Sequence, residues 1–195
     1  MYSPPHFRPP NPDTAWDLAH DHPVGLLITA TGDLAPLPWL VDRENAAHRA
    51  HHAAASPIVF EGQVTVVFQG PDGNVSPTWY RAPHAHVPTW NYAVAVARGR
   101  AERLSRARTR KVLWDLCERF EPADGYRPSW IDGAFMDELL DAIVGVEVHV
   151  EDFTAKLKLS QNRAPEDRAG VLEALAANPY PGSAELLRWM HKVGS

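Results

Sequence analysis

Three histidines lie close together in the stretch RENAAHRAHHAAASP: His48, His51 and His52. A neutral imidazole is the commonest protein ligand of haem iron, and a single proximal histidine is enough. His51 and His52 are neighbours, so their side chains point in different directions and cannot both bind one iron from the same side. His48 and His52 could share a zinc ion on a helix, but no third ligand is evident. A solvated turn is the alternative to a metal site.

A second group of polar residues lies in two near-copies of one phrase, PTWY at 77–80 and PTWNY at 88–92. If the two copies form adjacent strands, their aromatic side chains pair across the strands and need no ligand. Polar side chains beside aromatic rings are better candidates for a binding pocket. We therefore single out Thr78, Thr89 and Asn91 as catalytic candidates and Trp79 as a cofactor contact.

A third group is the phrase KLSQNR, residues 158–163, which follows a strand-like alternation of valines. Lys158 and Arg163 can hold an anionic group such as a phosphate or a carboxylate. The same residues could instead form a structural network that joins the sheet to the C-terminal helices. Both interpretations stay open from the sequence.

The bulk composition limits the classes of protein. The chain has 195 residues, a net charge of −5 and one cysteine, Cys117. These values disfavour a nucleic-acid partner, a disulfide framework and a cysteine-based zinc site. No apolar run reaches the roughly 20 residues that span a bilayer. We expect a cytoplasmic protein with no membrane association, built as a single domain over residues 1–195.

The elements that must position these residues are mostly strands. A hairpin is predicted at 24–29 and 34–41, with strands at 63–70, 74–80, 89–100 and 143–159, and a turn at 70–73. Helices are predicted from residue 13, over 103–120 and 129–141, and in the C-terminal part from about 165 to 195. The alanine-rich stretch 43–57 is expected to form a helical turn or two. The fold class is mostly β with added helices.

Several of these motifs together resemble one family. The phrases FQGP at 68–71, SPTWY at 76–80, VPTWNY at 87–92 and KLSQNR at 158–163 are similar to those of the PaiB-like proteins, often called FMN-binding negative transcriptional regulators. The resemblance covers most of the chain. It implies an FMN-binding split β-barrel that forms a homodimer, with cofactor sites where the subunits meet.

The chain departs from the family where a flavin phosphate would bind. A family phrase with Arg and Asn appears here with Ala54 and Ser56, while its histidine is kept as His51. Some PaiB-like proteins are haem enzymes, the piperazate synthases, which close N5-hydroxy-L-ornithine into L-piperazic acid. The resemblance therefore implies haem b as cofactor, with FMN as the alternative, and a hydroxylated amino acid as the small-molecule substrate. His51 is the implied metal ligand, and the implied cofactor contacts are His51, His52, Trp79, Lys158 and Arg163. The alternative function is an FMN-binding regulator or a flavin oxidoreductase.

Overall fold

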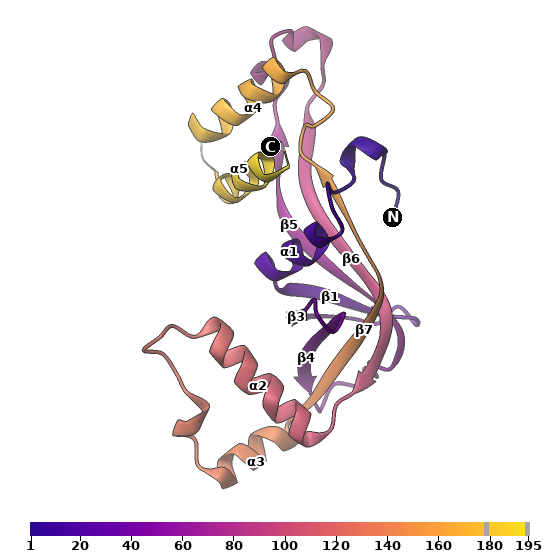
Figure 1. Ribbon diagram of the computed structural model, residues 1–195, viewed down its shortest axis with the longest axis vertical. Helices are drawn as coiled ribbons and strands as arrows, with labels where there is room; N and C mark the ends of the chain where they lie inside the picture. The colour runs from indigo at the N-terminus through magenta and orange to yellow at the C-terminus, as the bar shows by residue number, and fades with distance from the viewer. Residues whose placement is uncertain (178–179, 194–195) are drawn as a thin grey trace. The chain divides into compact units, whose positions relative to one another are not determined.

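The computed structural model describes residues 1–177 and 180–193 (Figure 1). Seven strands are found within these residues: β1 (Val24–Thr29), β2 (Leu34–Pro38), β3 (Leu40–Asp42), β4 (Ala47–Ala53), β5 (Gly62–Val75), β6 (Thr89–Arg103) and β7 (Ile143–Lys158). They form one sheet in the order β2-β1-β5-β6-β7-β4-β3. β1 pairs antiparallel with β2 and β5, and β4 pairs antiparallel with β3 and β7. The predicted class, mostly β with added helices, is confirmed.

The helices follow the predicted order: α1 (Asp13–Asp21), α2 (Arg106–Phe120), α3 (Gly133–Asp141), α4 (Pro165–Ala177) and α5 (Ser183–Lys192). The first helix begins at Asp13, but its capping side chain is that of Asn11, whose Oδ1 accepts from the Thr14 backbone N–H at 3.0 Å. Ser105 and Asp132 cap α2 and α3 in the same way. No helix in the described part of the chain is both long and apolar enough to cross a membrane.

The chain forms two compact units, and each is described here by itself. Unit 1 comprises Met1–Asp21, Gln69–Val96 and Thr154–Ser195; unit 2 comprises His22–Phe68 and Ala97–Phe153. The three long strands β5, β6 and β7 each contribute residues to both units. The predicted C-terminal helices belong to unit 1 as α4 and α5, and residues 178–179 and 194–195 of that predicted stretch lie outside the described residues.

The core of unit 2 contains a histidine among aromatic rings. His48 is fully buried, and its ring lies 5.2 Å from that of Phe68 and 5.1 Å from that of Phe153. Trp39 is also fully buried, and its Nε1 donates to the Gly25 carbonyl at 3.1 Å. A Cβ on Gly25 would come within 2.9 Å of Phe68, Trp39 and Val66, so only glycine fits beside these side chains.

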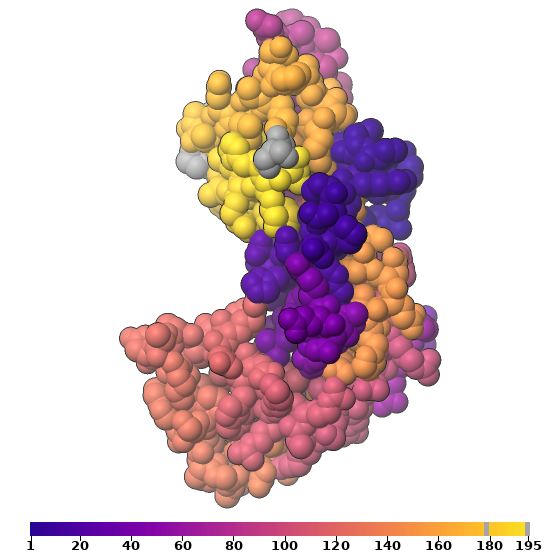
Figure 2. Space-filling view, viewed as in Figure 1, coloured from indigo at the N-terminus to yellow at the C-terminus, as the bar shows by residue number. Residues whose placement is uncertain are grey.

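Unit 1 has an aliphatic core, and α1, α4 and α5 supply much of it. Figure 2 shows α4 and α5 packed side by side on the surface of this unit. The largest side chains with less than 2% exposure in this core are Leu18, Leu157, Leu159, Leu175, Leu186, Trp189 and Met190. Burial of such side chains contributes roughly 1.5–3 kcal/mol each and is what holds the helices on the sheet.

The alanine-rich stretch predicted to be helical is a strand instead. Ala47–Ala53 form β4, which pairs residue by residue with β7, from Ala47 opposite His149 to Ala53 opposite Ile143. Alanine favours helix by only a few tenths of a kcal/mol over most residues, and strand pairing plus the burial of His48 and Ala50 outweighs that preference.

The segment from 70 to 80 also differs from its prediction. Residues 70–73 lie within β5 and do not form a turn, and 77–79 form a short 3₁₀ helix where a strand was predicted. The glycines here permit close packing: a Cβ on Gly70 would lie 2.6 Å from Leu18 Cδ1, and one on Gly73 would lie 1.6 Å from the Tyr180 hydroxyl. Ser76 starts the 3₁₀ helix, because its side chain accepts a hydrogen bond from the Thr78 backbone N–H.

Candidate functional site

The predicted site residues are divided between the two units. Thr78, Trp79, Thr89, Asn91, Lys158 and Arg163 all belong to unit 1. His51 and His52 belong to unit 2. The two sets are therefore built up separately.

In unit 1, alternation along β6 and β7 places lysines and aromatic rings on the exposed face of the strands. Asn91 and Ala93 on β6 are buried, whereas Trp90 is 51% exposed and Tyr92 is partly exposed. On β7, Leu157 is buried, and its neighbours Lys156 and Lys158 are partly exposed. This is the period-two pattern of strands with one buried face.

Four residues of this face form a group that we call the lysine–tyrosine cluster: Tyr2, Tyr92, Lys156 and Lys158. The Lys156 ammonium lies 5.7 Å from the Tyr2 ring centroid and 5.4 Å from that of Tyr92. The Lys158 ammonium lies 5.9 Å from the Tyr92 ring and donates to Thr89 Oγ1 and to the Trp90 carbonyl, both at 2.6 Å. Thr89 and Lys158, which were singled out from separate motifs, are thus in direct contact.

The cluster gathers like charges. Partial burial lowers the pKa of Lys158, and the positive charges of Arg163 and Lys156 lower it further, although Tyr92 opposes them. The partners of the Lys158 ammonium, a hydroxyl and a carbonyl, carry no charge. A bound anion would relieve this repulsion, which makes the cluster a suitable place for a phosphate or a carboxylate.

Asn91 lies behind this face, inside unit 1. It is 1% exposed, and its Nδ2 donates to Ser160 Oγ at 3.0 Å, while Ser160 Oγ lies 3.2 Å from Asn91 Oδ1. Ser160 has a φ of 65°, in the left-handed region, so the chain turns sharply after β7. The amide of Asn91 is engaged within the fold, where it fixes the start of the 160–163 segment.

Thr78 and Trp79 lie in the 3₁₀ helix after β5. The Thr78 side chain is exposed, and its hydroxyl lies 2.8 Å from Ser76 Oγ. Trp79 is partly buried, and its carbonyl lies so close to α4 that a Cβ on Gly170 would come within 2.2 Å of it. Both residues connect the 3₁₀ helix to its surroundings in unit 1.

Arg163 takes part in a chain of polar contacts that the sequence did not indicate. Its Nη1 donates to His86 Nδ1 at 3.2 Å, and its guanidinium lies 5.0 Å from the centroid of the Tyr80 ring. His86 Nε2 in turn lies 3.9 Å from Asp167 Oδ2. Because arginine can only donate, His86 must accept at Nδ1 and carries its proton on Nε2, facing Asp167.

In unit 2, His48 and His52 lie on one side of β4 and His51 on the other. His51 is partly buried, and burial lowers its pKa, with a further contribution from His52. Its imidazole is therefore neutral at pH 7, as metal binding requires. Among residues 1–177 and 180–193, the His51 ring forms no hydrogen bond or ion pair. His52 Nδ1 lies 3.0 Å from the Ala53 carbonyl, and its ring lies 4.5 Å from that of Phe60.

His52 also lines a small pocket of about 170 Å³, together with Ala54, Ser56 and Arg103. The pocket is smaller than the roughly 300–1,000 Å³ typical of sites for drug-sized ligands. Ala54 and Ser56 are the positions where the family phrase has Arg and Asn, so Arg103 supplies a guanidinium near the place where one was lost. Nothing in the local sequence indicates this, since Arg103 lies at the end of β6, about fifty residues further along the chain.

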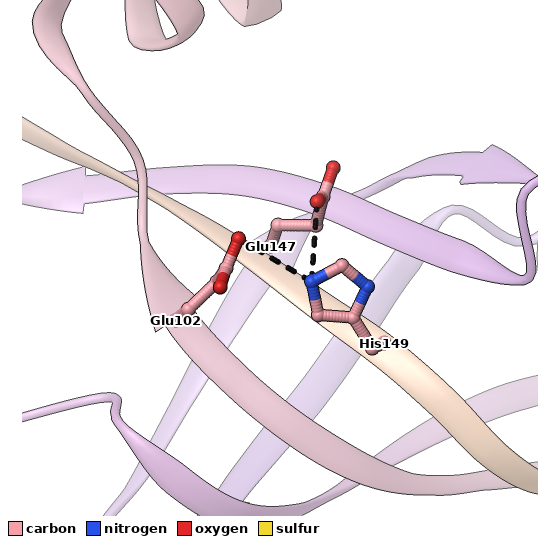
Figure 3. A group of neighbouring side chains, drawn as sticks. All are labelled: Glu102, Glu147 and His149. Carbon is pink, nitrogen blue, oxygen red and sulfur yellow. Dashed lines mark ion pairs between the residues drawn. The ribbon is translucent and has the colours of Figure 1, made fainter.

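Glu102, Glu147 and His149 form a group with the residue types of a metal site (Figure 3). His149 Nε2 lies 3.3 Å from Glu102 Oε1 and 3.4 Å from Glu147 Oε1. However, Arg108 donates to Glu147 Oε1 at 2.6 Å, and Arg49 donates to Glu147 Oε2. Despite the burial of Glu147, these arginines hold its pKa below the usual range. The oxygens that a cation would need are thus already bound, and the group is an ion-pair network.

Comparison with known proteins agrees with the fold. Among the solved structures that share it is a FAD- and haem-binding protein from Mycobacterium smegmatis. It has a TM-score of 0.58 and 20% sequence identity, and the match covers 80% of this chain and 76% of that protein's chain. Another is the flavocytochrome Anf3 from Azotobacter vinelandii. It has a TM-score of 0.55 and 16% sequence identity, and the match covers 80% of this chain and 72% of the Anf3 chain. The fold is the split barrel of the flavin-binding proteins.

The family follows from the sequence comparison. The model of the family described as "Putative FMN-binding domain" matches residues 1–152, and the chain belongs to this family. Protease synthase and sporulation protein PAI 2 of Bacillus subtilis is 28% identical over 97% of this chain and 96% of its own length. An uncharacterized protein of Aspergillus fumigatus is 30% identical over 83% of this chain and 70% of its own length. The PaiB resemblance seen in the motifs is confirmed.

Proposed function

We propose that this protein binds FMN and carries out flavin-dependent oxidation and reduction of a small molecule. The observation that carries the proposal is the lysine–tyrosine cluster of unit 1, where Lys156 and Lys158 lie beside the faces of Tyr2 and Tyr92. Family membership supports the same cofactor. One protein of the same fold is named for FAD and haem binding, and another is named a flavocytochrome.

The residues of the cluster fit the cofactor. The phosphate of FMN carries a charge of about −1.5 to −2 at pH 7, and the charges of two ammonium groups can neutralise it. Tyr2 is 84% exposed and Trp90 is 51% exposed, so aromatic surface is available next to the charges. When bound, FMN would supply hydride or single-electron transfer. Lys158 and Lys156 would hold its phosphate, with Thr89 and the Trp90 carbonyl fixing the Lys158 side chain.

The first test compares FMN with riboflavin, which has the same ring system and no phosphate. Lys158→Ala should weaken FMN binding roughly 10- to 100-fold, because one charge-assisted hydrogen bond contributes about 1.5–3 kcal/mol. Riboflavin binding should change little. Quenching of flavin fluorescence during titration measures both dissociation constants.

Lys111→Ala is the matched control. Lys111 is an exposed lysine of α2 in unit 2, paired with Asp115, and its loss removes the same charge elsewhere. If Lys158→Ala and Lys111→Ala bind FMN equally well, the phosphate is held elsewhere. Equal losses for FMN and riboflavin in Lys158→Ala would also count against a phosphate contact.

A second candidate function rests on His51. Its imidazole is partly buried, neutral at pH 7 and without a partner among the described residues, which is what an axial ligand of haem b requires. The solved structures of this fold include one protein named for haem binding and one named a flavocytochrome. The corresponding activity is the cyclisation of N5-hydroxy-L-ornithine to L-piperazic acid.

This reaction is redox-neutral. The N–O bond of the hydroxylamine breaks, an N–N bond forms between the α-nitrogen and N5, and the hydroxyl leaves as water with a proton from the α-amine. Haem would supply a metal that binds and polarises the hydroxylamine. The role of this chain would be to hold the iron at His51 and to orient the substrate so that its two nitrogens meet.

The second test is reconstitution with hemin. The wild-type protein should develop a Soret band, and His51→Ala should lose it or shift its position. His52→Ala is the control, since its ring is already engaged with Ala53 and Phe60. A Soret band that is unchanged in His51→Ala would exclude His51 as the ligand. The haem-loaded protein is then incubated with N5-hydroxy-L-ornithine. Mass spectrometry shows whether a product forms whose mass is lower by one water, as the cyclisation requires.

Several inferences from the sequence stay predictions: the single domain over residues 1–195, the site residues, the homodimer, the small-molecule substrate, the lack of a nucleic-acid partner and the cytoplasmic location. We propose that the subunits of the dimer close the site, because the pocket beside His52 is small when one chain is considered alone.

A further inference from the structure

Unit 1 contains a pocket of about 460 Å³ beside α4, and neither candidate function uses it. Two arginines line it, Arg163 just before α4 and Arg168 within it, together with Gln161. Its remaining walls are apolar and come from Pro165, Ala169, Leu172 and Val193. Val193 follows α5, which packs beside α4 on the surface shown in Figure 2.

The charge of this pocket is positive and unbalanced. Its lining residues within the described chain include two guanidinium groups and no carboxylate. The contacts of Arg163 are with a neutral ring nitrogen of His86 and with the face of Tyr80. By contrast, Arg49, Arg106, Arg108 and Arg188 each form ion pairs with aspartate or glutamate.

Arg168 is held in place with a donor left over. Its Nη2 donates to the Met190 carbonyl, which ties the side chain to α5. Its Nε is buried and has no hydrogen-bond partner within residues 1–177 and 180–193. A buried donor that stays unsatisfied costs about 1–3 kcal/mol, so an acceptor at this position would stabilise the site.

The carboxylate of Asp167, the residue before Arg168, already has partners. Asp167, in the first turn of α4, accepts a hydrogen bond from the Arg81 backbone N–H at 2.9 Å and faces His86. It is not among the residues that line the pocket. Guanidinium groups bind carboxylates and phosphates through paired hydrogen bonds, and the apolar walls favour a ligand with a hydrophobic body.

We propose that this pocket binds an organic anion, namely a carboxylate attached to a compact apolar group. The carboxylate lies between Arg163 and Arg168, and the apolar group lies against Ala169 and Leu172. The proposal does not depend on FMN or haem, because Lys158 and His51 do not line the pocket.

The experiment is isothermal titration calorimetry of the full chain, without added cofactor, with benzoate as the probe. Benzamide has the same shape without the charge, and inorganic phosphate has the charge without the apolar body. Benzoate should bind, and benzamide and phosphate should bind at least about tenfold more weakly, the difference expected when a charge-assisted contact or the apolar contact is lost.

Two variants locate the binding. Arg168→Gln should weaken benzoate binding about tenfold or more. Ala169→Phe should fill the pocket without touching the guanidinium groups, and it keeps the test valid if Arg168→Gln disturbs the contact with Met190. Arg110→Gln is the matched control, since that guanidinium lies over Trp114 on α2 in unit 2.

The proposal is overturned if benzoate does not bind, if benzamide or phosphate binds as well as benzoate, or if Ala169→Phe binds benzoate like the wild type. FMN titration of Ala169→Phe separates the two sites, and its FMN affinity should equal that of the wild type. Loss of FMN binding in Lys158→Ala with intact benzoate binding is expected from two independent sites.

Discussion

Glu147→Met is expected to lower the free energy of unfolding by about 3 kcal/mol, the lower end of the range for removing one partner of a buried ion pair. Glu147 is 3% exposed, and its two oxygens accept from Arg108 and Arg49. Methionine has a similar size, so the loss arises from removing the buried carboxylate that the two guanidinium groups share. Arg49 then keeps only Asp42, and Arg108 keeps only Glu102. The lower end applies because the Arg108 side chain is half exposed. Urea unfolding measures the change, and the melting temperature should fall by roughly 6–12 °C.

Two further variants test the cause. Glu147→Met combined with Arg108→Met should recover part of the loss. In the single variant Arg108 keeps only its contact with the half-exposed Glu102 at 3.4 Å, whereas Arg49 still pairs with Asp42 at 2.7 Å. Glu118→Met on the exposed surface of α2 should change stability by less than about 0.5 kcal/mol. A cost below about 1 kcal/mol for Glu147→Met would contradict the ion-pair interpretation. Stabilisation of the wild type by added zinc would show that the Glu102–Glu147–His149 group binds a metal after all.

The second large effect is a loss of stability in acid caused by His48. Burial lowers the pKa of His48 from 6.5 to about 4. Above pH 6.5 the ring is neutral in both the folded and the unfolded chain, so it contributes no pH dependence. Between pH 6.5 and 4 the unfolded chain binds a proton that the folded protein excludes, and stability falls as the pH falls. The loss between pH 7 and pH 4 should be about 3 kcal/mol.

The measurement is urea unfolding at several pH values for the wild type and His48→Leu. The variant should lose most of the pH dependence in this window, and His84→Leu, which removes an exposed histidine, should keep it. His51 and His52 add smaller effects of the same sign, because burial lowers their pKa values as well. The carboxylates of Asp42 and Glu147 have pKa values lowered from 3.8 and 4.5, so their contribution is lost only as the pH falls below these values, at the acid end of this window and beyond it. An equal slope in wild type and His48→Leu would contradict the assignment.

Much of the fold can be predicted from the sequence where local pattern and tertiary contacts agree. The hairpin β1–β2 is predictable because a continuous apolar run, a turn with Gly32 and a return strand follow one another. Pro36 and Pro38 indicate an edge strand, and β2 lies at the edge of the sheet. The alternating valines predict strand β7, and the amphipathic pattern predicts helix α2, in the same way. Here local preference and packing favour the same element.

The wrong predictions of secondary structure occur where contacts between distant parts of the chain outweigh the local conformational preference of the residues. Alanines predict helix at 43–57, but β7 supplies a partner strand that the local sequence does not reveal. Gly70 and Gly73 resemble turn residues, whereas their function is to admit Leu18 and Tyr180. In both cases the deciding contact comes from a residue far away in the chain.

The same limit applies to the candidate sites. Lys158 of the KLSQNR phrase and Thr89 of the doubled phrase are in contact. That these residues form a binding site stays a prediction. Tyr2 and Lys156 join the cluster only through the folded arrangement of unit 1. Arg168 and Arg103 were missed because nothing in their local sequence distinguishes them from solvated arginines.

The segments of the two units alternate along the chain, and this order has a consequence for evolution and engineering. The polypeptide runs through five alternating stretches, of which the first, third and last form unit 1. Neither unit corresponds to an uninterrupted piece of the gene, so neither can be excised, duplicated or exchanged between relatives by a single recombination event. In contrast, α2 and α3 lie in one continuous segment of unit 2, Ala97–Phe153, which could be replaced by a single insertion. Diversification of such a protein is therefore expected to proceed by exchange of inserted helices and by point substitution.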